Sequence, residues 1–186
     1  MIRLFPLFRR FSAREDGNIA VEMAIALPIL ISLLLGGLEI MTFTLLNEKT
    51  ERASASLADL VAQSESLSAG ELADLTGVAS EIMEPFDVST SGRIIVSSIS
   101  ADPEGTVLIN WQKAYGGGGG GSRYGAAGGT PLLPVGLIVR PNESLIAAEV
   151  FFDHEPIFTP KVISATRVER ASVLRPRFAP LTQLAD

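Results

Sequence analysis

The sequence IAVEMAIALPILISLLLGGLEIMTFTLL, residues 19–46, decides the fold of this chain because it is almost entirely apolar. Glu22 and Glu39 are its only charged residues, and the 16 residues between them carry no charge. A helix of about 20 apolar residues crosses the roughly 30 Å of hydrocarbon in a bilayer. The stretch therefore predicts a transmembrane helix over residues 18–46. The two glutamates would lie about 26 Å apart along it, so we expect them near opposite edges of the hydrocarbon layer.

Charged residues on either side of the apolar stretch predict its orientation. Residues 1–17 form a basic leader, with four arginines against Glu15 and Asp16. Because positively charged segments stay on the cytoplasmic side of a membrane, we expect the leader in the cytoplasm and residues 47–186 outside it. The apolar stretch is too long for a cleaved secretory signal peptide, whose apolar region spans about 7 to 15 residues.

Composition argues against several classes of function. The chain has 186 residues and a net charge of -6, so it offers no broad basic surface for nucleic acid. It contains no cysteine and one histidine, which removes thiolate metal sites and the usual base for nucleophilic catalysis. We therefore expect no enzyme activity, no cofactor, no metal and no small-molecule substrate. A membrane-anchored hydrolase with a serine–lysine pair stays open as an alternative, although no motif indicates one.

Two local motifs suggest ligand binding, but their spacing does not favour it. Residues 116–121 are six consecutive glycines, and the run ends in Gly-Ser-Arg rather than the Gly-Lys-Ser/Thr of a phosphate-binding loop. We expect a flexible loop over residues 115–130. The acidic neighbours of His154 in 153–155 are adjacent to it in sequence, so the three side chains cannot all face one metal ion. A polar turn before Pro156 is the expected structure there.

The rest of the chain predicts an α+β domain, helical to about residue 84 and with strands between about 92 and 175. An apolar stripe continues the first helix to about residue 66. A capping box at Ser68 begins a second helix over 70–83. Alternating apolar residues predict strands of a small antiparallel sheet at 93–99, 106–112, 145–152 and 167–174. The positions expected to be buried are Leu46, Thr50, Ala53, Leu57, Leu60, Val61 and Ser64 in the first helix, Leu72, Leu75, Val78, Ala79 and Ile82 in the second, and, each set on one face of its strand, Val107, Ile109 and Trp111, and Ile146, Ala148, Val150 and Phe152.

The start of the apolar stretch carries a more specific motif. The sequence Gly17-Asn18-Ile19-Ala20-Val21-Glu22 resembles a type IV prepilin processing site, in which a basic leader ends in glycine and the fifth residue after it is glutamate. Over residues 9–60 the chain resembles a narrower group, the TadE-like minor pseudopilins of bacterial tight-adherence (Tad or Flp) pilus systems. Their pattern G-x-x-A-V-E-F-A-x-x-x-P, with a second glutamate near the far end of the helix, is matched by Ala20, Val21, Glu22, Ala24, Pro28 and Glu39. Met23 stands where the group usually has an aromatic residue.

This resemblance implies a function. A prepilin peptidase would cut between Gly17 and Asn18 on the cytoplasmic side of the bacterial inner membrane, leaving a periplasmic pilin-like domain. The mature chain would be a minor pseudopilin, a structural or assembly subunit of a Tad-type pilus that serves adherence and biofilm formation. Its partners would be membrane lipid, the peptidase and other pilins and pseudopilins. Glu22 would pair with the N-terminal amine of a neighbour, and Glu39 would share in setting the subunit register.

Two further points follow from the same stretch. Pro28 lies about a third of the way along the predicted helix and predicts a kink there. The alternative to a pilus subunit is an uncleaved single-pass inner-membrane protein whose periplasmic domain binds a ligand or a scaffold. The two hypotheses differ at Gly17, which only the pilus subunit requires.

Overall fold

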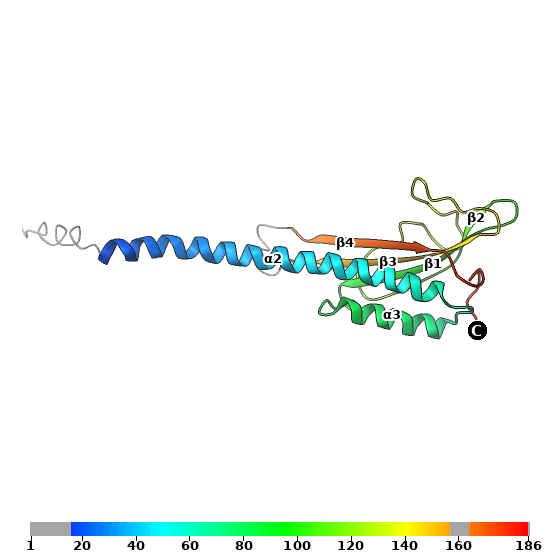
Figure 1. Cartoon of the computed structure of the whole chain (residues 1–186), viewed down its shortest axis with the longest axis horizontal. Helices are drawn as coiled ribbons and strands as arrows, with labels where there is room; N and C mark the ends of the chain where they lie inside the picture. Colours follow the sequence, from blue (N-terminus) through cyan, green and yellow to red (C-terminus); the bar gives the residue numbers. More distant parts are fainter. Residues whose placement is uncertain (1–15, 157–163, 186) are drawn as a thin grey trace, which may run out of the picture.

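The computed structural model describes residues 16–156 and 164–185 and shows an α+β fold (Figure 1). Its elements are α2 (Asp16–Ala62), α3 (Ala69–Met83), β1 (Gly92–Ala101), β2 (Val107–Tyr115), β3 (Ser144–His154) and β4 (Thr166–Leu174). The predicted long apolar helix, second helix and four strands are all present. The first helix ends at Ala62, four residues before the predicted end.

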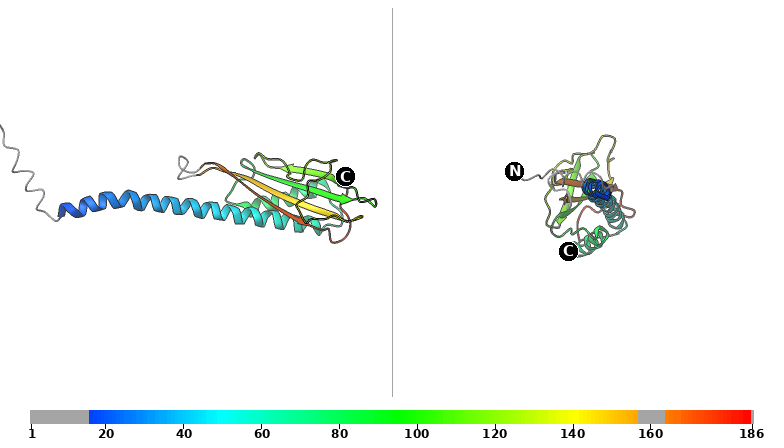
Figure 2. Two further views of the ribbon diagram at one scale, coloured as in Figure 1. Left: turned by 90° about the horizontal axis from the view of Figure 1, so that it is seen from above. Right: turned by 90° about the vertical axis from the view of Figure 1, so that its left-hand side faces the viewer.

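Helix α2 has two halves with different surroundings (Figures 1 and 2). Its N-terminal half projects from the rest of the described structure. Its C-terminal half packs lengthwise on the sheet and beside α3, and these three parts together are called the head below. The two halves differ in burial. Apolar side chains are exposed over the projecting half, whereas Leu46, Thr50 and Ala53 in the packed half are fully buried.

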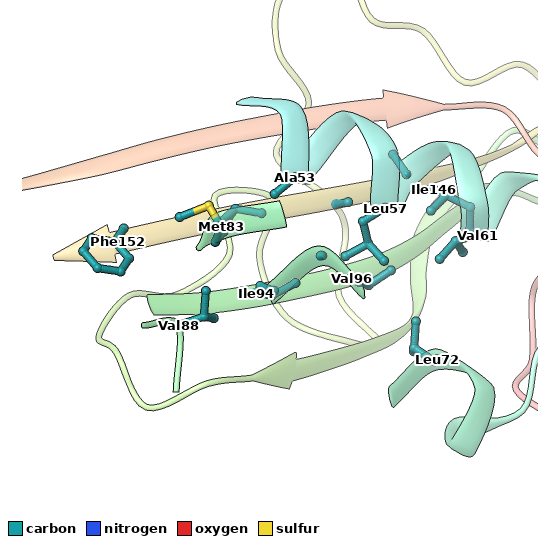
Figure 3. Close-up of a cluster of buried hydrophobic side chains, with 14 of the residues drawn as sticks. Ala53, Leu57, Val61, Leu72, Met83, Val88, Ile94, Val96, Ile146 and Phe152 are labelled. Carbon is teal, nitrogen blue, oxygen red and sulfur yellow. The ribbon is translucent and has the colours of Figure 1, made fainter. Parts of the chain in front are cut away.

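The four strands form one open antiparallel sheet in the order β2-β1-β3-β4. The face turned toward α2 and α3, called the inner face, carries the main core (Figure 3). The prediction for β3 is confirmed, because Ile146, Ala148, Val150 and Phe152 all belong to this core. Figure 3 shows Leu57 of α2 between its helix and the sheet, close to Val96.

Helix α3 begins with the predicted capping box. The Ser68 hydroxyl accepts a hydrogen bond from the Glu71 amide, and the Glu71 carboxylate accepts one from the Ser68 amide at 2.8 Å. The hydrogen bonds that the Glu71 carboxylate accepts from the Ser68 amide and hydroxyl lower the pKa of Glu71. Ser64, predicted in the stripe of the first helix, lies beyond the end of α2. Two further positions of the predicted apolar stripes are wrong, because Leu60 of α2 is 37% exposed and Val78 of α3 is 43% exposed. Both lie at the margin of a stripe that is narrower than the sequence suggests.

Strand β2 corrects the prediction that Val107, Ile109 and Trp111 share one face. The register between β1 and β2 shifts after Ser98, so that Ser98 pairs with Trp111 and Ile99 pairs with Ile109. The extra residue of this β-bulge turns the strand over. Trp111 consequently joins the main core, and its indole N–H donates to the Leu181 carbonyl at 2.7 Å, whereas Ile109 packs in a second cluster on the opposite face.

The opposite, outer face of the sheet is covered by the long connection between β2 and β3. Tyr124 and Val139 of this connection pack with Ile99, Ile109 and Leu145 in the second cluster. Strand β3 is therefore buried on both faces for most of its length. The glycines of 116–121 begin this connection and run past the backbone of residues 88–92.

Close backbone approach explains glycine at the start of the run. A Cβ atom on Gly117 would lie 2.3 Å from the Ser89 carbonyl oxygen, and one on Gly118 would lie 2.6 Å from that of Ser91. The Gly118 amide also donates to the Gly92 carbonyl at 2.8 Å. The run therefore follows a defined path with little room for side chains, while its predicted flexibility stays a prediction.

We predict that Gly117→Ala destabilises the head by about 1–3 kcal/mol, because the added methyl group meets backbone atoms that must shift. Gly121→Ala is the matched control from the same run, since nothing lies within 4 Å of a Cβ placed there. Urea unfolding followed through Trp111, the chain's one tryptophan, measures both variants. Equal stability of the two variants would mean that the run does not hold this path.

Candidate functional site

The predicted processing residues lie at the start of α2. Gly17 and Asn18 fall in its first turn, and Glu22 follows one turn later with an exposed side chain. Its apolar neighbours Ile19 and Val21 are 63% and 57% exposed. The start of the helix thus presents a carboxylate within an otherwise apolar surface that no described part of the chain covers.

Helix α2 is long and apolar enough to cross a membrane. Among the described residues it is the one helix that meets this test, over Ile19–Ala62, with a most apolar window of mean hydropathy 2.3 that is 0% buried. An apolar helix surface left open to water over this length is unfavourable, whereas in lipid it is the expected surface.

Pro28 and the glycine pair lie inside this uncovered part of α2. The helix continues through Pro28, and the Ser32 hydroxyl donates to the Pro28 carbonyl at 2.8 Å. The predicted kink at Pro28 stays a prediction. A Cβ on Gly36 or Gly37 would meet nothing within 4 Å, so neither glycine is required by packing within the described chain.

Glu39 has a different environment from Glu22, because it is directed into the head. It is 3% exposed, and its Oε1 lies within hydrogen-bond distance, 3.2 Å, of Nε2 of His154. The Phe43 ring packs against the imidazole with centroids 5.5 Å apart. These side chains line a cavity of about 170 Å³ together with Ile40 and Thr166. The register role predicted for Glu39 concerns neighbouring subunits and stays a prediction.

His154 corrects one prediction from the sequence. The expected polar turn over 153–155 is wrong, because β3 extends through Asp153 to His154 and the imidazole is buried. The sequence contained a usable signal. The chain's one histidine follows an apolar strand, and Glu39 lies in an apolar helix, so both polar groups needed a partner.

Three more polar contacts join α2 to later parts of the chain beyond Glu39. The Arg170 guanidinium donates to Asn47 Oδ1 at 2.7 Å, and the Ser54 and Ser172 hydroxyls are 3.1 Å apart. The Arg177 guanidinium donates to Asp59 Oδ1 at 2.6 Å. Together with Glu39–His154 these pairs form the polar seam, which joins α2 to β3, to β4 and, through Arg177, to the segment that follows β4. They fix the position of the helix along its axis.

The outer face of the sheet holds a second group of charges. Glu149 on β3 is fully buried and accepts a hydrogen bond from the Arg123 amide at 2.9 Å, and burial raises its pKa. The Arg123 guanidinium forms an ion pair with Glu169 on β4. Because the pKa of Glu149 is higher in the folded chain than in the unfolded chain, the folded state favours the protonated acid. The folded state therefore loses stability as the pH rises from the ordinary pKa of a glutamate through this raised pKa.

Nearer the end of β3 the glycine run meets an exposed ion pair. The Arg167 Nε atom donates to Asp153 Oδ1 at 2.6 Å, which holds the pKa of Asp153 below its ordinary value. The Gly119 amide donates to the same carboxylate at 3.2 Å. The Asp153–Arg167 pair is thus joined to the glycine run, whereas Glu149 Oε2 and Arg93 Nε on the same face are buried without a hydrogen-bond partner among the described residues.

A cavity of about 590 Å³ lies at the C-terminal end of α3. Its lining is acidic and includes Glu81, Glu84 and Asp87. Hydrogen bonds from Ser89 lower the pKa of Asp87. Within residues 16–156 and 164–185, no three histidine or carboxylate side chains converge in a way that could hold a metal ion.

Comparison with known proteins gives no relative for this chain: it matches no protein-family model, no curated protein and no solved structure. The inference of function therefore depends on the motif at the start of α2 and on the physical chemistry of the fold.

Proposed function

We propose that this chain is a minor pseudopilin, a subunit used in the assembly of a Tad-type pilus in bacterial adherence and biofilm formation. The observation that carries the proposal is the position of Gly17-Asn18-Ile19-Ala20-Val21-Glu22 at the start of one unbroken apolar helix. Cleavage after Gly17 would leave Glu22 as the fifth residue of an apolar N-terminal helix. The head follows on the same helix without a linker, so a position taken by the helix in an assembly would be transmitted to the head.

The mechanism of such a subunit is structural. The exposed apolar residues of α2 would pack against lipid before assembly and against other pilin helices afterwards. Glu22 would meet the new N-terminal amine of a neighbour, because either charge is costly in an apolar medium without a partner. Buried ion pairs are better suited to setting register than to adding stability. In this proposal the leader stays in the cytoplasm and the head lies in the periplasm.

Cleavage is the test of this function. We predict that co-expression with a prepilin peptidase shortens the chain to one that begins at Asn18, as read by intact mass and N-terminal sequencing of the membrane fraction. Gly17→Val should abolish the cleavage. Gly37→Val is the matched control, because it lies in the same helix with free space around it and should still be cut.

An uncut wild-type chain beside an active peptidase would reject the proposal. The alternative would then stand, a single-pass membrane protein that keeps its leader and acts through its periplasmic head.

A further inference from the structure

The exposed apolar surface of α2 continues past Glu39 toward the head. Ile40 and Met41 are 68% and 69% exposed, and Phe43 and Leu45 are each 37% exposed. The next charged residue along the helix is Glu48, which is exposed. The four apolar residues are called the apolar collar below. The collar extends the apolar surface from Glu39 to Leu45 by about 9 Å along the helix axis.

Glu39 does not place a charge on this apolar surface, because its carboxylate is directed into the head and buried there. The side chain points to His154 and is enclosed with Phe43 and Thr166. At the same level of the helix Met41 is exposed, and Ile40, at the edge of this cavity, is also mostly exposed. A charged group without a partner is costly in the hydrocarbon of a bilayer. A carboxylate that is hydrogen-bonded and shielded from lipid avoids much of this cost. The burial of Glu39 in the head, with His154 as one of its partners, therefore allows this turn of the helix to enter the membrane.

A charged pair limits how deeply the head can sit. Asp153 and Arg167 lie beside the end of β3 on the outer face, with their side chains 40% and 43% exposed. An exposed ion pair is compatible with the headgroup layer and not with the hydrocarbon. The collar and this ion pair together define where the hydrocarbon layer of the membrane would end. Acyl chains would contact Ile40 and Met41, and headgroups would surround the base of the head.

We propose that the base of the head is seated in the outer surface of the membrane, with the apolar collar in contact with lipid and the Glu39–His154 pair inside the interface. The partner is the lipid surface, since the collar continues the apolar surface of the candidate membrane span without a break. This inference rests on the membrane anchoring that is part of the proposed function. It does not require cleavage or pilus assembly.

Depth measurements test the seating directly, because the chain has no cysteine and accepts single labels cleanly. Cysteine is introduced at Leu33, Met41 or Glu51 of the full chain, labelled with an environment-sensitive fluorophore and reconstituted into phosphatidylcholine–phosphatidylglycerol vesicles. We expect lipid-borne quenchers to reach the labels at positions 33 and 41, and aqueous iodide to quench position 51 severalfold more strongly than position 41.

The three positions separate failure of this inference from failure of the anchoring. Iodide quenching at position 41 as strong as at position 51, with position 33 protected, would overturn the seating while leaving the anchoring intact. Iodide quenching at position 33 would overturn both. Protection of position 41 from iodide and from lipid quenchers alike would mean that protein covers the collar, which also overturns the proposal.

The role of His154 is tested in the Met41→Cys background. His154→Ala should raise iodide quenching at position 41 severalfold, because it removes the buried imidazole that encloses the Glu39 carboxylate and opens this site to water. The double variant Glu39→Gln/His154→Ala removes the charge and should restore protection. Unchanged Trp111 emission shows that the head remains folded in each variant. Identical quenching in all three chains would overturn the role assigned to the pair.

Discussion

Replacing Glu22 with alanine is expected to produce a chain that enters the membrane and is cut after Gly17 but is absent from assembled pili. The apolar helix becomes more hydrophobic, so insertion does not suffer. What the variant loses is the carboxylate that would pair with the amine of a neighbour, and an unpaired amine in an apolar assembly costs several kcal/mol. Immunoblots of sheared pili and of the membrane fraction measure the two outcomes separately.

Glu48→Ala is the control for this experiment. Glu48 lies on the same helix with an exposed side chain, beyond the apolar surface, so its removal should leave assembly unchanged. Wild-type amounts of the Glu22→Ala chain in pili would rule out the proposed ion pair. Loss of both variants from pili would show that assembly responds to any change of charge along α2.

The largest loss of stability is expected from Leu57→Ala. Leu57 is 0% exposed in the main core between α2 and the sheet (Figure 3). Truncation of a buried leucine to alanine costs about 2–5 kcal/mol, because apolar burial is lost and a cavity remains. Urea unfolding of the detergent-solubilised chain, followed through buried Trp111, measures the change in the free energy of unfolding.

Leu60→Ala provides the comparison, since Leu60 lies one turn further along α2 and is 37% exposed. It should cost much less than Leu57→Ala. If both variants lost the same free energy of unfolding, α2 would not bury the Leu57 side against the sheet as the structure shows.

Much of the fold could be predicted because it is encoded locally. The capping box at Ser68 and the alternation in Ile146, Ala148, Val150 and Phe152 concern residues a few positions apart, and both are confirmed. The bulge in β2 could not be predicted, since one extra residue in a strand leaves no mark on composition and yet separates Ile109 from Trp111.

The candidate site was predictable only where it is contiguous in sequence. Gly17 and Glu22 belong to one motif, so the sequence alone predicts them as a processing site, and this stays a prediction. Glu39 and His154 are 115 residues apart, and their pairing depends on how the sheet is placed along α2. Sequence reasoning assigned His154 to a turn because it weighed only its immediate neighbours.

The polar seam has a mechanical consequence. Its four pairs are spread along α2 from Glu39 to Asp59, over about 30 Å of helix. Strands β3 and β4 run along the same axis (Figure 1). Tension applied to the projecting end of the helix would therefore load all four pairs in shear at the same time, rather than peeling them apart one after another. The head is joined to its helix in the geometry that best carries a pull along that helix.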